Sequence, residues 1–121
     1  MAGRILVIDD EEVMRELLRL HLTSAGYAVQ AAEDAIAAGY AVLKSPPDLI
    51  VCDVEMPHMN GIELIRALRA DKSLPPVPVI FLTSVDEGEV RADEMRADYL
   101  QKPVRLEELL AVVQRHLPWR R

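Results

Sequence analysis

The sequence predicts an α/β fold in which one domain, residues 1–121, holds a doubly wound, five-stranded parallel sheet with the strand order 2-1-3-4-5. Short, largely apolar runs alternate with longer stretches whose apolar residues recur at helical spacing. This alternation is typical of right-handed βαβ units. The apolar runs indicate buried strands, as expected when helices cover both faces of a parallel sheet.

The first part of the chain begins with a predicted strand at Arg4–Ile8. An amphipathic helix follows and stops at Gly26, a residue suited to a helix C-terminus. Its apolar stripe is predicted to contain Val13, Leu17, Leu18, His21 and Leu22. The second strand is predicted at Ala28–Ala31, and an alanine-rich helix at Ala35–Lys44 ends before a Ser-Pro-Pro turn.

The second part of the chain continues the same alternation. The third strand is predicted at Leu49–Cys52, the fourth at Val77–Leu82 and the fifth at Asp98–Leu100. A helix after Asn60-Gly61 is marked by Ile62, Leu64, Ile65 and Leu68. The last helix ends by Pro118 and is marked by Leu106, Leu109, Leu110 and Val113.

The composition excludes several classes of protein. The net charge of −6 argues against direct nucleic-acid binding, which needs a basic surface. The single cysteine permits no intrachain disulfide, so a reducing compartment is allowed. No apolar stretch approaches the roughly 18 residues of a membrane span, and no signal peptide is recognisable. We therefore expect a cytoplasmic protein with no membrane partner.

Polar side chains follow four of the predicted strands at their carboxyl ends. In chain order these residues are Asp9-Asp10, Asp53, Thr83-Ser84 and Lys102-Pro103. The carboxyl ends of parallel strands lie along one edge of a sheet, and ligands bind outside that edge where the strand order reverses. The order 2-1-3-4-5 places strands 1 and 3 side by side, so the Asp9-Asp10 pair is expected to face Asp53.

These residue types suit the handling of a phosphoryl group. Carboxylates without histidine or cysteine favour Mg²⁺ over zinc. Asp53 is the candidate nucleophile, because aspartyl phosphates are an established form of covalent catalysis. Thr83 is a candidate hydrogen-bond donor and Lys102 a candidate counter-charge, which a cis bond to the following proline would direct toward the acids. Simpler interpretations are that the Asp9-Asp10 pair caps a helix and that Lys102 is solvated.

Four motifs together carry a resemblance to a known family. They are Asp9-Asp10, the segment from Asp53-Val54-Glu55-Met56-Pro57 to Asn60-Gly61, Leu82-Thr83-Ser84 and Tyr99-Leu100-Gln101-Lys102-Pro103. Each motif alone is weak, but the ordered set resembles the receiver domain of bacterial two-component response regulators. The resemblance covers essentially the whole chain and implies a flavodoxin-like fold.

The resemblance implies a phosphoacceptor signalling domain. Asp53 would accept a phosphoryl group from a sensor histidine kinase or a phosphotransfer protein. Lys102 would pair with the phosphoryl oxygens, Thr83 would move toward them, and Tyr99 would turn inward as the threonine shifts. Such a domain is not an enzyme for other substrates, because it promotes only its own phosphorylation and dephosphorylation.

The resemblance also implies a cofactor and partners. Asp10 and Asp53 would ligate Mg²⁺ directly, together with the backbone carbonyl of Glu55, and Asp9 would act through a metal-bound water. A downstream effector domain or protein would read the phosphorylated state. Some members of the family dimerise on phosphorylation, so the resemblance also suggests a phosphorylation-dependent dimer. The side chain of Glu55 is placed where it would hinder or orient a water molecule that attacks the acyl phosphate.

One stretch departs from the family pattern. The segment between Thr83 and Lys102 is about one helical turn shorter than the resemblance implies. The deficit falls in residues 86–96, where charged residues are frequent. We therefore predict a shortened or irregular fourth helix. Helix 4, strand 5 and helix 5 form the face through which the family usually dimerises or docks partners, so we predict that this protein does not use the symmetric interface there.

Two other functions stay open at this point. A pseudo-receiver would bind partners without phosphorylation, although the complete set of Asp10, Asp53, Thr83 and Lys102 argues against it. A Mg²⁺-dependent phosphatase with an aspartyl nucleophile would need an Asp-x-Asp signature after the first strand, whereas Glu55 occupies the third position after the third strand. The sequence names neither the kinase nor the output, and it leaves open whether the domain stands alone.

Overall fold

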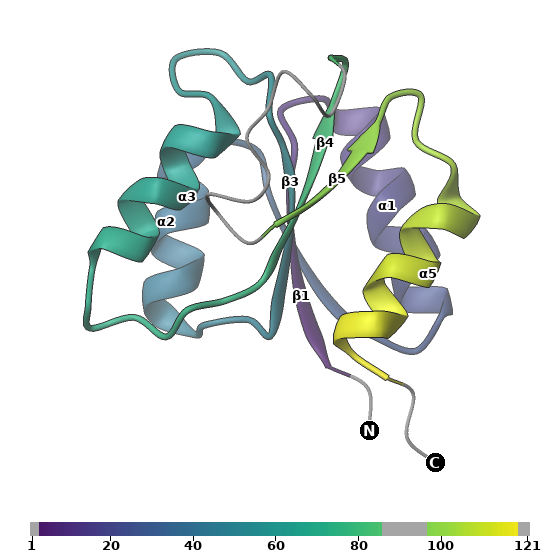
Figure 1. The fold of residues 1–121 in the computed structure, drawn as a ribbon, viewed down its shortest axis with the longest axis horizontal. Helices are drawn as coiled ribbons and strands as arrows, with labels where there is room; N and C mark the ends of the chain where they lie inside the picture. The colour runs from purple at the N-terminus through teal and green to yellow at the C-terminus, as the bar shows by residue number, and fades with distance from the viewer. Residues whose placement is uncertain (1–2, 86–96, 119–121) are drawn as a thin grey trace.

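The computed structural model describes residues 3–85 and 97–118. The strands in these residues form one sheet, in which all neighbouring strands run parallel. The strand order is β2-β1-β3-β4-β5, which confirms the predicted order (Figure 1). The strands are β1 (Arg4–Ile8), β2 (Ala28–Ala32), β3 (Leu49–Asp53), β4 (Val79–Thr83) and β5 (Asp98–Gln101). The chain order therefore reverses between β1 and β3.

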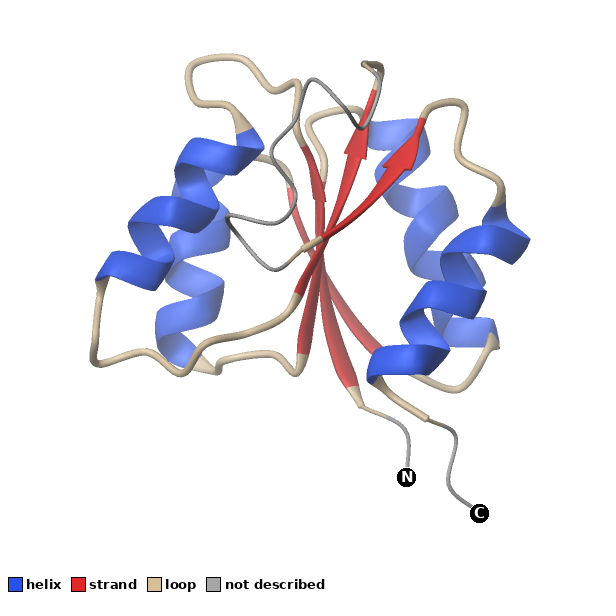
Figure 2. Ribbon diagram, viewed as in Figure 1, coloured by secondary structure: helices blue, strands red, loops and turns tan. Residues whose placement is uncertain are grey.

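Helices lie on both faces of the sheet (Figure 2). Within the described residues they are α1 (Glu12–Ser24), α2 (Ala35–Lys44), α3 (Gly61–Ala70) and α5 (Leu106–His116). Figure 1 shows α2 and α3 on one face and α1 and α5 on the other, which confirms the doubly wound, flavodoxin-like arrangement. None of these helices is both long and apolar enough to span a membrane. The segment 86–96, for which we predicted an irregular fourth helix, lies outside the described residues.

The core has two layers, one on each face of the sheet. Successive side chains of a strand point to opposite faces, so Leu6 and Ile8 pack on the α2–α3 side and Ile5 and Val7 on the α1–α5 side. Every residue of β3 and β4 is buried, which explains why these strands are almost continuously apolar. Each large aliphatic side chain buried in these layers contributes about 1.5–3 kcal/mol.

The predicted apolar stripe of α1 was partly wrong. Leu18 and Leu22 are fully buried, but Val13 is 77% exposed and Leu17 is 44% exposed. The half-buried Met14 packs against the core in their place. Residues four apart lie close together on a helix, so Met14, Leu18 and Leu22 form one narrow line that excludes Val13 and Leu17.

The strands β2 to β5 each end one residue later than predicted, and in β3 and β4 this places functional candidates inside the sheet. Asp53 is the last residue of β3 and Thr83 is the last residue of β4. The start of β4 is also later than predicted, because Pro78 has no N–H to donate to a ladder. Its carbonyl still accepts a hydrogen bond from the N–H of Ile50 at 3.0 Å.

Helix ends are set by local residues, as the sequence indicates. The side chain of Asp34 accepts a hydrogen bond from the Ala37 N–H at 2.8 Å, and the side chain of Asn60 accepts one from the Glu63 N–H at 3.0 Å. Caps of this kind are worth about 1 kcal/mol each. Gly26 follows α1 with φ 101°, the left-handed conformation that glycine adopts without strain.

Candidate functional site

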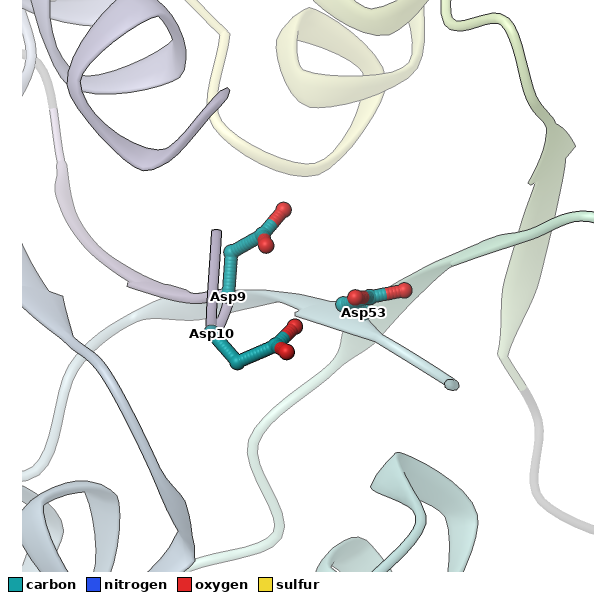
Figure 3. Close-up of side chains that lie close together, drawn as sticks. All are labelled: Asp9, Asp10 and Asp53. Carbon is teal, nitrogen blue, oxygen red and sulfur yellow. The ribbon is translucent and has the colours of Figure 1, made fainter. Parts of the chain in front are cut away.

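Three carboxylates meet at the carboxyl end of the sheet, as predicted. Asp9 and Asp10 follow β1, and Asp53 ends β3 (Figure 3). Ile8 pairs with Cys52 in the parallel register, so Asp9 and Asp53 lie at the same level of the sheet. One carboxylate oxygen from each of the three residues lies within 4.8 Å of the other two. Asp9 and Asp53 are buried, with exposures of 2% and 3%, and Asp10 is exposed.

Asp9 is fixed by the start of α1 but does not cap that helix. Its Oδ1 accepts a hydrogen bond from the N–H of Glu11 at 2.9 Å, and its backbone carbonyl accepts one from Arg15 Nη1 at 2.9 Å. Glu11 is itself the residue at the N-cap position, and it makes no side-chain cap bond. The interpretation of the Asp9-Asp10 pair as a simple helix cap is therefore wrong for this structure.

The buried carboxylates are electrostatically strained. Burial raises the pKa of Asp9 from its usual 3.8 to about 6; the Glu11 N–H opposes this rise, and the nearby charge of Asp53 adds to it. Burial also raises the pKa of Asp53, against the effect of its hydrogen bond from Lys102. The three carboxylates repel one another and offer only oxygen ligands, so the site fits a small hard cation such as Mg²⁺.

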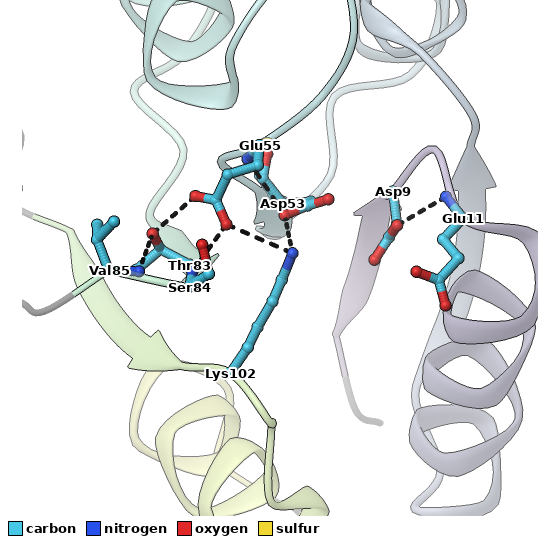
Figure 4. Close-up of polar contacts among 9 residues, drawn as sticks. Asp9, Glu11, Asp53, Glu55, Thr83, Ser84, Val85 and Lys102 are labelled. Carbon is cyan, nitrogen blue, oxygen red and sulfur yellow. Dashed lines mark hydrogen bonds and ion pairs between the residues drawn. The ribbon is translucent and has the colours of Figure 1, made fainter.

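Lys102 reaches Asp53 from the end of β5. Its Nζ donates a hydrogen bond to Asp53 Oδ1 at 2.6 Å (Figure 4). Its backbone N–H donates to the Thr83 carbonyl at 2.7 Å. The peptide bond between Lys102 and Pro103 is cis. Partial burial lowers the pKa of Lys102, but the hydrogen bond to Asp53 and the negative charges of Asp53, Glu55 and Asp9 together raise it overall. The interpretation of Lys102 as a solvated lysine is therefore wrong here.

Glu55 bridges the loops that follow β3 and β4. Its Oε2 accepts a hydrogen bond from the Thr83 hydroxyl at 2.7 Å, and its Oε1 accepts one from the Ser84 N–H at 2.7 Å (Figure 4). The same Oε1 lies 3.6 Å from Lys102 Nζ. Sequence reasoning considered the Glu55 carbonyl and an effect of the side chain on water, and it missed this bridge.

A signal for the bridge was present in the strand pairing. Asp53 pairs with Leu82, so Glu55 and Ser84 lie equally far beyond the paired positions. Partial burial raises the pKa of the Glu55 carboxyl, but the hydrogen bonds from Thr83 and Ser84 and the charge of Lys102 together lower it below the usual value. The bridge therefore favours the charged form of Glu55.

Thr83 is fully engaged in this structure. The residue is 1% exposed, and its hydroxyl donates to Glu55 while it accepts a hydrogen bond from the Val85 N–H at 3.2 Å. Tyr99 lies further from the acids, on β5, where its ring stacks on Phe81 with centroids 5.2 Å apart. Tyr99 is 7% exposed and so lies inward in this structure. Its movement, like that of Thr83, stays a prediction.

Gly61 lets α3 begin close to the site. Its N–H donates to the Val54 carbonyl at 2.8 Å, and a Cβ atom at this position would lie 2.2 Å from the backbone oxygen of Asp53. In the loop before it, His58 has a φ of 72°, which is unusual for a residue other than glycine. Sequence reasoning placed the start of a helix here and did not identify the close approach.

The structure thus gathers most of the predicted site residues at one end of the sheet. Asp9, Asp10, Asp53, Thr83 and Lys102 come together, and Tyr99 stands apart as a buried neighbour of Phe81. The metal-ligand role of the Glu55 carbonyl and the water-mediated role of Asp9 stay predictions.

The sequence of the chain is similar to those of known proteins. The family model described as "Response regulator receiver domain" matches residues 5–114. A curated relative, "Response regulator MprA" of Mycobacterium tuberculosis (strain ATCC 25177 / H37Ra), is 42% identical over 114 residues, which are 92% of this chain and 49% of the relative. The chain therefore spans about half the length of the curated relatives that it matches.

Solved structures are similar over nearly the whole chain. The chemotaxis response regulator CheY4 of Vibrio cholerae is 32% identical with a TM-score of 0.87, and the match covers 97% of this chain and 100% of that chain. The signal receiver domain of a signal transduction histidine kinase from Syntrophus aciditrophicus is 34% identical with a TM-score of 0.84. The match covers 95% of this chain and 89% of that chain. NtrX from Brucella abortus, in complex with ATP, is 28% identical with a TM-score of 0.83, and the match covers 96% of this chain and 27% of that chain.

Proposed function

Because the chain belongs to the family of response regulator receiver domains, we propose that it is a phosphoacceptor signalling domain that takes a phosphoryl group onto Asp53. One observation carries the proposal. Asp53 Oδ1 lies 2.6 Å from the ammonium group of Lys102, while the Asp53 carboxylate also belongs to the cluster with Asp9 and Asp10. A nucleophilic carboxylate that has both a cation and oxygen ligands beside it is suited to phosphoryl transfer.

The proposed donor is a phosphohistidine on a sensor histidine kinase or a phosphotransfer protein. A carboxylate oxygen of Asp53 attacks the phosphorus atom, and a P–O bond forms while the P–N bond breaks. The donor imidazole keeps the electron pair of the broken bond and takes up a proton. Lys102 balances the negative charge of the phosphoryl oxygens, so positioning and electrostatics supply most of the rate. We propose no turnover of other substrates by this domain.

Mg²⁺ is the proposed cofactor, and its charge would offset that of the transferred group when it is bound. Asp10 and Asp53, with the backbone carbonyl of Glu55, are its proposed protein ligands, and Asp9 would act through a water molecule. Two observations support the fit: the carboxylate oxygens converge within 4.8 Å, and burial with mutual repulsion raises the pKa of Asp9.

The proposed switch couples the site to the edge of the sheet. The Thr83 hydroxyl would turn to donate to a phosphoryl oxygen, and the position of Tyr99 on the adjacent strand would respond. Thr83 pairs with Gln101 and Phe81 pairs with Tyr99, so the two switch residues belong to one pair of strands. A downstream effector domain or protein would read the change.

The proposed setting is the cytoplasm, without direct nucleic-acid or membrane partners for this domain. The net charge of −6 supports the first of these exclusions. We also propose that any phosphorylation-dependent dimer avoids the symmetric face of helix 4, strand 5 and helix 5. The shortened segment 86–96 motivates this proposal, and a beryllofluoride-induced dimer formed through that face would contradict it.

The proposed function is tested by phosphorylation in vitro. The protein is incubated with acetyl phosphate and Mg²⁺ and then analysed by intact-mass spectrometry. We expect one labile phosphoryl adduct on the wild-type chain, no adduct on Asp53→Asn, and an unchanged adduct on the exposed control Asp71→Asn. Turnover of phosphoesters without an adduct would indicate a phosphatase, and the absence of both would indicate a pseudo-receiver.

A further inference from the structure

The Glu55 carboxylate occupies hydrogen-bond donors at the end of β4, beside the pair of Lys102 and Asp53. One of its oxygens accepts a hydrogen bond from the Thr83 hydroxyl at 2.7 Å. The other accepts a hydrogen bond from the Ser84 N–H at 2.7 Å and lies 3.6 Å from Lys102 Nζ. A carboxylate and a phosphoryl group are both anions that accept hydrogen bonds through oxygen atoms. Glu55 is therefore held by a set of groups that also suits a phosphoryl group.

The donors cannot serve both anions at once. The Thr83 hydroxyl has one proton, and its orientation is fixed because the oxygen also accepts a hydrogen bond from the Val85 N–H at 3.2 Å. The Ser84 backbone likewise has one N–H. Each donor that binds a phosphoryl oxygen must first lose its contact with Glu55, and two anions beside each other would also repel.

We propose that the Glu55 side chain is an intramolecular competitor of the phosphoryl group, which holds Thr83 and Ser84 in the unphosphorylated chain and must leave when Asp53 is modified. This inference rests on the proposed phosphoacceptor function. Glu55 thereby opposes phosphorylation and keeps Thr83 from turning toward Asp53 in the unmodified state. The Glu55 side chain positions Thr83 and takes no part in the transfer itself.

The geometry allows Glu55 to leave without unfolding of the site. The Glu55 side chain is 39% exposed, whereas Asp53 is 3% exposed and Thr83 is 1% exposed. Its carboxylate can rotate into water, which replaces the lost hydrogen bonds. Expulsion therefore costs the two charge-assisted hydrogen bonds and the attraction of Lys102, and these are partly offset by solvation.

The test is binding of beryllofluoride, an inorganic mimic of the phosphoryl group, at saturating Mg²⁺. Bound beryllofluoride is observed by fluorine NMR, and its half-saturation concentration is compared between the wild-type chain and three variants. We expect Glu55→Ala to lower this concentration about tenfold, since the lost contacts are hydrogen bonds to a charged group. Glu55→Gln should have a smaller effect in the same direction, because the amide oxygen can still accept one hydrogen bond.

Glu11→Gln is the matched control, because it removes an exposed negative charge close to Asp9 without touching Thr83. It should change the half-saturation concentration by less than about twofold, as expected for a screened surface charge. A half-saturation concentration that is unchanged or raised in Glu55→Ala overturns the inference. An equal effect of Glu11→Gln also overturns it, because general electrostatics would then explain the result.

A second readout does not depend on binding. The Ser84 amide proton donates to a carboxylate in the wild-type chain, so its NMR resonance should move upfield in Glu55→Ala before any ligand is added. An unchanged Ser84 resonance would overturn the bridge itself. If neither the wild-type chain nor the variants bind beryllofluoride, and Asp53→Asn leaves acetyl phosphate labelling unaltered, the proposed function has failed as well. Binding by the wild type without a Glu55 effect refutes the competitor alone.

Discussion

The ammonium group of Lys102 lies 2.6 Å from Oδ1 of Asp53, although the two residues are 49 positions apart in the sequence. The Asp53 side chain is 3% exposed, so water supplies little of its stabilisation, while Lys102 is 30% exposed. The protein itself must therefore balance the charge of the proposed nucleophile. This contact makes the acidic end of the sheet compatible with a stable fold when no cation is bound.

Replacing Lys102 with methionine should lower the free energy of unfolding by about 2 kcal/mol at pH 7 without Mg²⁺, because Asp53 is left buried without its counter-charge. Urea denaturation measures this loss. The exposed control Lys72→Met should leave stability nearly unchanged. Adding Asp53→Asn to Lys102→Met should recover most of the loss, and a double variant as unstable as Lys102→Met alone would contradict the explanation.

The stability of the Mg²⁺-free chain should depend on pH through Asp9. The pKa of Asp9 is raised by burial to about 6 from 3.8, so the folded chain binds more protons than the unfolded chain between these values. The contribution of Asp9 to stability is therefore fully present below pH 3.8 and is lost as the pH rises through 6.

The expected loss from this residue is about 1 kcal/mol between pH 5 and pH 7. It is measured as the difference between the wild-type chain and Asp9→Asn in urea denaturation at each pH, because other groups also titrate in this range. A wild-type chain whose stability rises with pH relative to Asp9→Asn would refute the assignment.

Mg²⁺ should raise the thermal unfolding midpoint at pH 7. A ligand that binds only the folded chain stabilises it by about 2.7 kcal/mol at one hundred times its dissociation constant. The effect should vanish with a chelator and should be strongly reduced in Asp10→Asn, which removes an exposed member of the cluster. Asp71→Asn should keep the full response. Equal Mg²⁺ responses of Asp10→Asn and Asp71→Asn would place the cation elsewhere.

Two glycine-to-alanine substitutions should have opposite effects. Gly61→Ala places a Cβ atom 2.2 Å from the Asp53 backbone oxygen, so α3 must move away from β3. We expect a loss of about 2 kcal/mol and a weaker Mg²⁺ response, because Asp53 would shift with its strand. Gly39 lies within α2, and a Cβ atom there meets nothing within 4 Å. Gly39→Ala should therefore stabilise the protein by roughly 0.5–1 kcal/mol.

The order and type of the described elements could be predicted from local patterns. The helix Ala35–Lys44 has the predicted bounds, because the Asp34 cap and the Ser-Pro-Pro segment enclose it. The stripe of α1 could be predicted only in part, since Val13 and Leu17 are apolar and yet exposed. The positions of apolar residues along a helix do not show which of them face the core and which face solvent when they lie near the same side.

The site was predictable where a strand end determined it. Asp9, Asp53 and Thr83 came from the rule that parallel strands end at one edge, and the structure places them there. Glu55 was different, because a carboxylate in a loop has several partners within reach of its side chain. Its contacts with Thr83 and Ser84 depend on how two loops fold back over the end of the sheet.

The sequence by itself determined the strand order, the cluster of Asp9, Asp10 and Asp53, and the family, because periodicity, strand ends and ordered motifs are properties of the linear chain. Only the tertiary structure decided which charges are paired. Lys102 contacts Asp53, and Glu55 binds Thr83 and Ser84, because parallel pairing brings strand ends from distant parts of the chain within hydrogen-bond distance. At that range small differences in side-chain direction choose the partner, and no local pattern in the sequence records them.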